Sequence, residues 1–127
     1  MLLDTCTLIW LASDPRKLSN RASSQIKIYS NTLFISAISA FEIGVLVYRK
    51  KLLLPMPTAE WVSRTLDHHG IAEIPIDINI SLSATELPRH HNDPFDRIII
   101  ATSVINTLQL LSPDKEIAKY SEARVVW

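Results

Sequence analysis

The chain has few of the residues on which many active sites and small folds are built. Its 127 residues include one cysteine, Cys6, and two glycines, Gly44 and Gly70. A single cysteine excludes an internal disulfide framework and a zinc site with several cysteine ligands. Two isolated glycines cannot form a glycine-rich phosphate loop, which argues against a P-loop or a dinucleotide-binding fold.

An excess of charge and a long apolar run are also missing. Thirteen basic and thirteen acidic side chains give a formal net charge of zero, so any nucleic-acid binding must come from a local patch. No run approaches the roughly 18 apolar residues that span a bilayer. The amino terminus also lacks the basic region and apolar run of a signal peptide. Together with the single cysteine, these absences predict a cytoplasmic protein without a membrane segment.

The residues that are present suit one globular domain. Hydrophobic residues make up 47% of the chain and charged residues 20%, a balance that fits a packed core. At this length the simplest organisation is a single domain over residues 1–127.

Short apolar runs alternate with longer helical patterns along the chain. Strands are expected at 1–3, 32–36, 71–76, 109–111 and 124–127. Helices are expected at 5–12, 18–29, 36–52, 58–69, 77–87, 93–108 and 114–120. Thr58 is expected to cap its helix and Gly70 to end it, and Pro75 suggests an edge strand. Strands separated by helices are typical of an α/β fold with a parallel sheet.

Four acids stand where these elements begin or end, or within an apolar helix. Asp4 closes the first strand, and Asp114 follows the strand at 109–111. Glu42 lies inside an apolar helix, and Asp96 lies in the first turn of the helix that starts at 93. Sites in such sheets form beyond the carboxyl ends of the strands, so we expect the acids to face one crevice. Converging carboxylates make an oxygen-rich site for Mg²⁺ or Mn²⁺.

Each acid also has an ordinary structural interpretation. Asp4 and Asp114 could cap the helices that follow them. The stretch Asp93-Pro94-Phe95-Asp96 has the pattern of a helix start. Glu42 could form a salt bridge with a nearby arginine or lysine. Capping and metal binding are compatible, so both interpretations stay open.

The acids and the sequence around them resemble the PIN-domain family, and within it the VapC-type ribonuclease toxins of toxin–antitoxin pairs. The matching stretches are Leu2-Leu3-Asp4-Thr5, Ile35-Ser36-Ala37, Phe41-Glu42-Ile43, Asn92-Asp93-Pro94-Phe95-Asp96-Arg97, Leu110-Leu111-Ser112-Pro113-Asp114 and Val125-Val126-Trp127. The resemblance implies a three-layer α/β/α PIN-like fold with a central, mainly parallel sheet. It also implies a Mg²⁺- or Mn²⁺-dependent endoribonuclease that acts on RNA, forms a homodimer and is held inactive by a cognate antitoxin.

By position, the family's metal-binding and catalytic acids fall on Asp4, Glu42, Asp96 and Asp114. A water activated by the metal would attack the phosphodiester, so no nucleophilic side chain is needed. The chain departs from the family pattern in two places. Cys6 stands where many of these toxins have histidine, and we expect it to be a small buried side chain. Pro113 precedes the fourth acid and could alter how Asp114 approaches the site.

Two other functions stay open. A phosphatase with an aspartyl nucleophile, another metal-dependent phosphoryl hydrolase, would need a second aspartate at position 6, where this chain has cysteine. A non-catalytic protein-interaction module of the same fold would use the acids only as helix caps. Bound metal at Asp4 and Asp96 separates the ribonuclease from that module.

Aromatic and histidine side chains complete the candidates. Trp10, Trp61 and Tyr48 either fill the core or anchor a protein interface. The pairs His68-His69 and His90-His91 do not have a zinc-binding spacing, because neighbouring residues point in different directions. We expect both pairs at the polar surface.

Overall fold

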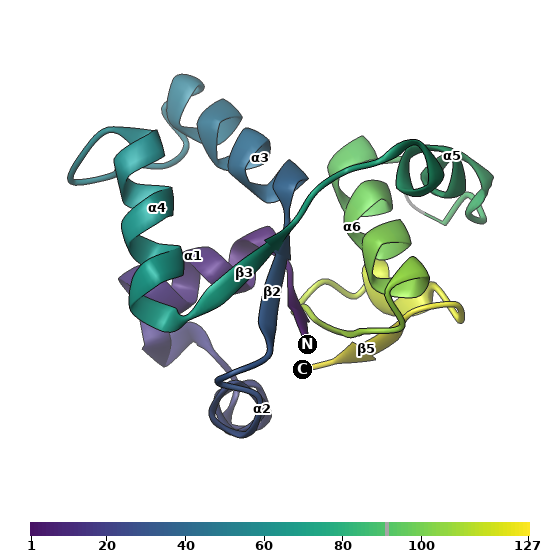
Figure 1. Ribbon diagram of the computed structural model, residues 1–127, viewed down its shortest axis with the longest axis horizontal. Coiled ribbons are helices and arrows are strands. Elements are labelled where there is room, and N and C mark those ends of the chain that lie inside the picture. The colour runs from purple at the N-terminus through teal and green to yellow at the C-terminus, as the bar shows by residue number, and fades with distance from the viewer. Residues whose placement is uncertain (91) are drawn as a thin grey trace.

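Five short strands form one parallel sheet at the centre of the computed structural model, which describes residues 1–90 and 92–127 (Figure 1). The strands are β1 (Leu2–Leu3), β2 (Leu33–Ser36), β3 (Ile71–Ile74), β4 (Gln109–Leu111) and β5 (Arg124–Val126). Their order is β3-β2-β1-β4-β5, and every neighbouring pair is parallel. Because β2 and β4 flank β1 on opposite sides, the carboxyl end of β1 is the switch point where open α/β sheets bind ligands.

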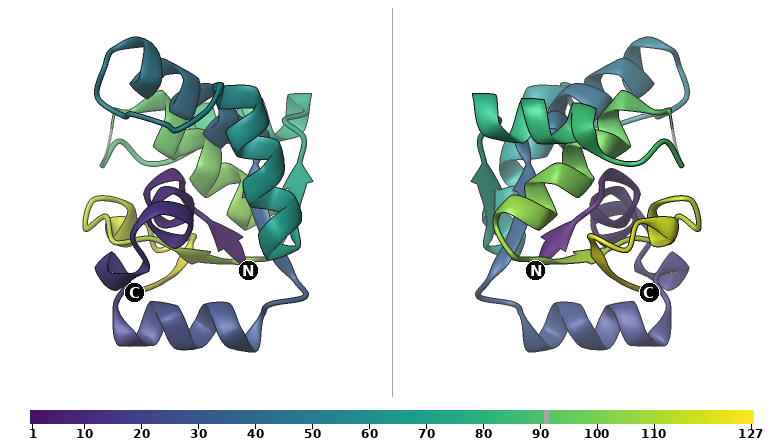
Figure 2. Two further views of the ribbon diagram at one scale, coloured as in Figure 1. Left: turned by 90° about the vertical axis from the view of Figure 1, so that its left-hand side faces the viewer. Right: turned by 90° about the vertical axis from the view of Figure 1, so that its right-hand side faces the viewer.

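Helices cover both faces of this sheet, which confirms the expected three-layer α/β/α arrangement. They are α1 (Thr5–Ser13), α2 (Asn20–Ile28), α3 (Ala37–Tyr48), α4 (Thr58–His69), α5 (Ile78–Glu86) and α6 (Pro94–Ile105), with 3₁₀ turns η1 (Pro15–Lys17) and η2 (Ile117–Lys119). Figures 1 and 2 show α1 and α4 on one side of the sheet and α5 and α6 on the other. Helix α3 contacts α1, α4 and α6. Within the described ranges, no helix combines the length and apolar character needed to cross a membrane.

The strand side chains alternate between two hydrophobic clusters. Leu3 and Leu111 pack in the cluster beneath α1, α2 and α4. Leu2 and Leu110 pack in the cluster beneath α5 and α6. Successive residues of a strand point to opposite faces of the sheet, and both faces are covered here. Continuous apolar runs are therefore required, as is usual in parallel sheets.

Several helix boundaries follow the capping pattern of the sequence. Ser19 accepts a hydrogen bond from the Ala22 N–H at 3.0 Å and caps α2. Gly70 ends α4 with a left-handed φ of 61°. The expected cap at Thr58 was wrong: Pro57 takes the capping position, and Thr58 is the first helical residue. Pro57 has the extended backbone of a capping residue (ψ 142°), so Thr58 itself already lies within the helix.

Two helices end earlier than expected. Helix α3 stops at Tyr48 and not at Leu52, because Lys50 adopts a left-handed φ of 56°. Helix α6 stops at Ile105 because Thr107 has a φ of 54°. Neither residue is a glycine, so the sequence does not mark these turns.

The expected helix over 114–120 is the largest error in the predicted elements. Only the 3₁₀ turn η2 forms there. The Oδ1 atom of Asp114 accepts the N–H of Glu116 at 2.7 Å. Such a bond two residues ahead gives the backbone an alternative to a helix.

Candidate functional site

The four predicted acids stand on elements that lie around the carboxyl ends of the central strands. Asp4 directly follows β1, and Asp114 follows β4. Glu42 projects from α3 and Asp96 from the first turn of α6. Each of the other three acids raises the pKa of Asp96 through its charge. The charges of Asp4, Glu42 and Asp114 therefore act on Asp96, and the metal-binding and catalytic roles of the four acids stay predictions.

Asp4 is the most deeply held of the four. Its side chain is only 4% exposed. The Oδ1 atom accepts the Thr7 N–H at 2.6 Å, and Oδ2 accepts the Ser112 hydroxyl at 2.5 Å. Asp4 thus caps α1 as expected, but burial outweighs these hydrogen bonds and raises its pKa. A buried carboxylate of this kind gains stability from any cation that reaches it.

Glu42 is held by a hydroxyl group. The Thr5 hydroxyl donates a hydrogen bond to its Oε2 atom and also lies 3.1 Å from the Ser39 hydroxyl oxygen. Burial, followed by the charges of Asp93 and Asp4, raises the pKa of Glu42. An ion pair with arginine or lysine, the structural alternative, does not form within the described residues.

The start of α6 contributes two acids with different surroundings. Asp93 caps the helix, because its Oδ1 atom accepts the Phe95 N–H at 2.8 Å. Asp96 is half-buried one turn further along. Burial, then Asp93, then Glu42 raise the pKa of Asp96 to about 7. This segment therefore starts α6 through the Asp93 cap, and it also brings Asp96 under the influence of the other acids.

Ser112 connects two of the acids and was not among the predicted residues. Its hydroxyl donates to Asp4, and its oxygen accepts the Asp114 N–H at 3.1 Å. Leu3 pairs with Leu111. The residues that follow them, Asp4 and Ser112, therefore also face each other. A hydroxyl residue directly after an apolar strand is the only signal for this partner in the sequence.

Asp114 keeps its place in the group although Pro113 precedes it. It contributes to the raised pKa values of both Asp4 and Asp96. Its own Oδ1 atom accepts the Glu116 N–H. Pro113 therefore does not remove Asp114 from the acidic group, and the capping interpretation of Asp114 holds for a turn.

Cys6 lies beside the acids, and its expected burial was wrong. The residue is exposed. Desolvation of the thiol, and then the charges of Asp4, Glu42 and Asp96, raise its pKa to about 12. Cys6 is therefore protonated near pH 7 in the metal-free protein, which makes it a poor nucleophile.

The donor atoms of this site suit a hard divalent cation. They are carboxylate oxygens supported by hydroxyl groups, which is the chemistry that Mg²⁺ and Mn²⁺ prefer. The pKa values of Asp4, Glu42 and Asp96 are all raised, and a bound cation would relieve the repulsion behind part of that rise. Within the described residues, however, no three acidic, histidine or cysteine side chains converge into a ready coordination shell. The carboxylates would have to draw together around the ion.

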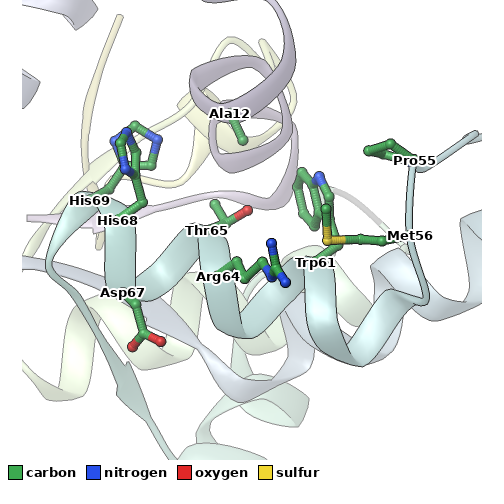
Figure 3. Close-up of a pocket in the computed structure, with 9 residues that line it drawn as sticks. All are labelled: Ala12, Pro55, Met56, Trp61, Arg64, Thr65, Asp67, His68 and His69. Carbon is green, nitrogen blue, oxygen red and sulfur yellow. The ribbon is translucent and has the colours of Figure 1, made fainter.

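A separate cavity of about 440 Å³ lies on α4 and does not border the acids (Figure 3). It is lined by Ala12, Pro55, Met56, Trp61, Arg64, Thr65, Asp67, His68 and His69. The cavity thus combines apolar side chains with charged and polar ones. The two histidines stack edge to face, with ring centroids 4.8 Å apart.

The remaining aromatic and histidine side chains differ in burial, so their predictions have different outcomes. Trp61 is buried in the core, and Trp10 packs edge-on against Trp127. Tyr48 is 89% exposed, so it alone of the three candidate anchors is free of the core. His90 is at the surface, as expected, with its ring against Tyr120. His91 lies outside the described residues.

Comparisons with known proteins agree with the observed fold. The sequence model of the PIN domain family matches residues 1–123. Ribonuclease VapC22 of Mycobacterium tuberculosis is 28% identical over 127 residues, which cover 99% of this chain and 95% of that protein. A chain in a toxin–antitoxin complex from Klebsiella pneumoniae is 25% identical with a TM-score of 0.67, covering 99% of this chain and 95% of that one. A chain of VapBC2 from Rickettsia felis, bound to promoter DNA, has a TM-score of 0.73 at 10% identity and shows the shared fold, covering 98% of this chain and 96% of that one.

Proposed function

The chain belongs to the PIN domain family, and from this premise we propose that it is a metal-dependent endoribonuclease, the toxin of a type II toxin–antitoxin pair. Its substrate would be RNA and its cofactor Mg²⁺ or Mn²⁺, at work in the cytoplasm. The curated relative named as a ribonuclease supports the activity. The related chains in toxin–antitoxin complexes support the role.

One observation carries the proposal. Asp4 is buried at the switch point of the sheet, has a raised pKa and is coupled to Asp114. A helix cap alone needs no such burial and gains nothing from neighbouring negative charges. The arrangement instead suits a carboxylate whose repulsion by neighbouring acids is relieved when a cation binds. This favours the enzyme over the non-catalytic module.

Some residues of the site would bind the cation, and others would position the carboxylates. Asp4 and Asp96 would hold the cation directly, and Glu42 and Asp114 would hold it directly or through water. Ser112 and Thr5 would fix the orientation of the carboxylates they contact. When bound, the metal would lower the pKa of a coordinated water, orient it for in-line attack on the phosphodiester and offset transition-state charge.

The direct test is incubation of the purified protein with mixed cellular RNA in Mg²⁺, Mn²⁺ or EDTA. We expect cleavage in one or both metals and none in EDTA. The matched control is Asp4→Asn, which keeps the shape of the side chain and removes its charge. Equal cleavage with and without EDTA, or by both proteins, would contradict the assigned chemistry. No binding of either ion in calorimetry at millimolar metal would exclude the metal site.

The exposed apolar side chains support a further part of the proposal, a homodimer that also binds an antitoxin. Ile78 and Leu82 stand one turn apart on α5, 77% and 57% exposed. Such a pair suits the centre of a protein interface. Light scattering at micromolar concentration should give twice the monomer mass, and Ile78→Ser with Leu82→Ser should reduce it. A wild-type protein that stays monomeric would exclude the homodimer.

The cavity on α4 would anchor the antitoxin through an apolar side chain, while another antitoxin segment covers the acids. Ala12 is exposed at its edge, so Ala12→Trp would fill the cavity without disturbing the core. This variant should bind co-expressed antitoxin more weakly and cleave RNA as the wild type does. Unchanged antitoxin binding would place the anchor elsewhere.

A further inference from the structure

An aromatic pair on the two helices that carry Glu42 and Asp96 has no role in the function proposed so far. Phe41 lies on α3, and its side chain is 62% exposed. Its ring centroid is 5.7 Å from that of Phe95 on α6, with the ring planes tilted by 49°. Each of these residues directly precedes an acid of the site, Glu42 or Asp96. The two helices that position these acids thus also meet through this pair.

We propose that Phe41 is a substrate-binding residue on which an unpaired base of the RNA stacks, beside the acidic group. The inference rests on the proposed ribonuclease function. Aromatic rings bind single-stranded RNA by stacking on its bases, whatever the base is. The half-buried Phe95 contacts the Phe41 ring, so part of the Phe41 ring is already held in place before RNA arrives.

The charges of the site explain why an uncharged contact is needed. The charges of Asp4, Glu42, Asp93 and Asp114 each raise the pKa of Asp96, and these acids would also repel RNA phosphates. A bound cation offsets this repulsion at only one point. Stacking adds affinity that does not depend on charge, so it can hold the substrate beside an acidic group.

The nearest arginine does not supply that affinity. Arg97 belongs to the same motif as Asp96 but points into the protein. Its guanidinium donates to the carbonyl oxygens of Ala84 at 3.0 Å, Leu87 at 2.8 Å and Pro88 at 2.9 Å. These bonds hold the end of α5 and the start of the following loop. Arg97 therefore serves the fold and is not available as a phosphate clamp.

The test compares Phe41→Leu, which keeps apolar bulk but removes the stacking face, with Phe41→Trp, which enlarges that face. Tyr48→Leu is the matched control, because Tyr48 is exposed two turns further along the same side of α3. The substrate is a short single-stranded oligoribonucleotide that the wild type cleaves. We expect Phe41→Leu to raise KM by roughly 5- to 100-fold, as loss of one stacked base does. The kcat should stay unchanged, and Phe41→Trp and Tyr48→Leu should keep the wild-type KM.

A second measurement reports stacking itself. An oligoribonucleotide that carries the fluorescent base 2-aminopurine should be quenched on binding to Asp4→Asn protein, which cannot cleave it. Adding Phe41→Leu to that protein should remove the quenching. The same quenching with and without Phe41 would overturn the inference.

The outcomes separate this inference from the proposed function. If the wild type cleaves no RNA in any metal, the ribonuclease proposal fails, and this inference fails with it. If the wild type cleaves and Phe41→Leu leaves KM unchanged, only the stacking inference fails. If Phe41→Leu instead lowers the mass seen by light scattering, the ring binds a second copy of the chain, which also overturns the inference.

Discussion

The acidic group has two sides, Asp4 after β1 and Asp96 on α6, and different contacts hold each of them. On the strand side, Asp4 is 4% exposed, and its two carboxylate oxygens are held by Thr7 and by Ser112, a residue 108 positions away. On the helix side, Asp96 is half-buried in the first turn of α6, and its pKa is raised to about 7. The strand side depends on distant parts of the chain, whereas the helix side depends on local capping. Changes that remove a hydrogen bond on the strand side should therefore damage both fold and activity, and changes on the helix side should separate them.

The largest effect is expected from Asp4→Asn on the strand side. Asparagine keeps an oxygen for the Thr7 N–H and can still bond to Ser112, so the fold should survive. The charge that holds the cation is lost, so RNA cleavage should fall to background. Glu42→Gln should give the same result.

Asp77→Asn is the matched control for these variants. Asp77 caps α5 through the Ile80 N–H at 2.8 Å, so the chemical change is the same at a cap outside the acidic group. Its cleavage rate should equal that of the wild type. If Asp4→Asn or Glu42→Gln also cut RNA at that rate, the assigned mechanism would be wrong.

Ser112→Ala should show that the strand side couples stability to activity. The change leaves a buried carboxylate oxygen of Asp4 without its hydroxyl donor, which typically destabilises a protein by about 1–3 kcal/mol. The pKa of Asp4 should rise further, and metal affinity should fall at neutral pH. Urea unfolding and calorimetry would measure the two effects, and Ser112→Thr should restore both. Ser81→Ala, which removes an exposed hydroxyl bonded to a carbonyl, is the control and should change neither.

Asp96 on the helix side should make the stability of the metal-free protein depend on pH. The pKa of Asp96 is about 7 in the folded chain, above its ordinary value of 3.8, so the folded state binds the proton more tightly than the unfolded state. Stability should therefore fall as the pH rises from about 4 to about 7, by on the order of 1–2 kcal/mol after allowance for partial exposure. Melting curves in EDTA should show this slope in the wild type and a smaller one in Asp96→Asn. Equal slopes would remove Asp96 as the cause.

The smallest effect is expected from Asp93→Ala, three residues earlier on the same helix start. Loss of the cap on the Phe95 N–H should destabilise the protein by about 0.5–2 kcal/mol. Much of the metal-dependent cleavage should remain. Asp96→Asn should do the reverse, with no cleavage and equal or higher stability in EDTA. An active Asp96→Asn beside an inactive but fully stable Asp93→Ala would reverse the two roles.

The acids could be predicted from the sequence because each interrupts or ends an apolar pattern. Asp4 and Asp114 follow apolar strands, and parallel strands bring such positions to one edge of the sheet. Capping patterns also located Asp93 and Gly70 correctly. In these cases the physical cause lies within a few residues, so it is visible in the sequence.

The supporting hydroxyls could not be predicted in the same way. Thr5 reaches Glu42 across 37 positions, and Ser112 reaches Asp4 across 108. These partners depend on which strands become neighbours, and no local pattern records that. The left-handed backbone of Lys50 at the end of α3 and the exposure of Cys6 likewise have no local pattern in the sequence.

The pairing of β1 with β4 also sets when the acidic group can form during folding. Asp4 follows β1, whereas the Ser112 hydroxyl that completes its surroundings lies 108 positions away, directly after β4. Contacts of such long sequence separation form late and slowly. The unfolded chain therefore carries all four acids without their arrangement, which appears only once these two distant strands have paired.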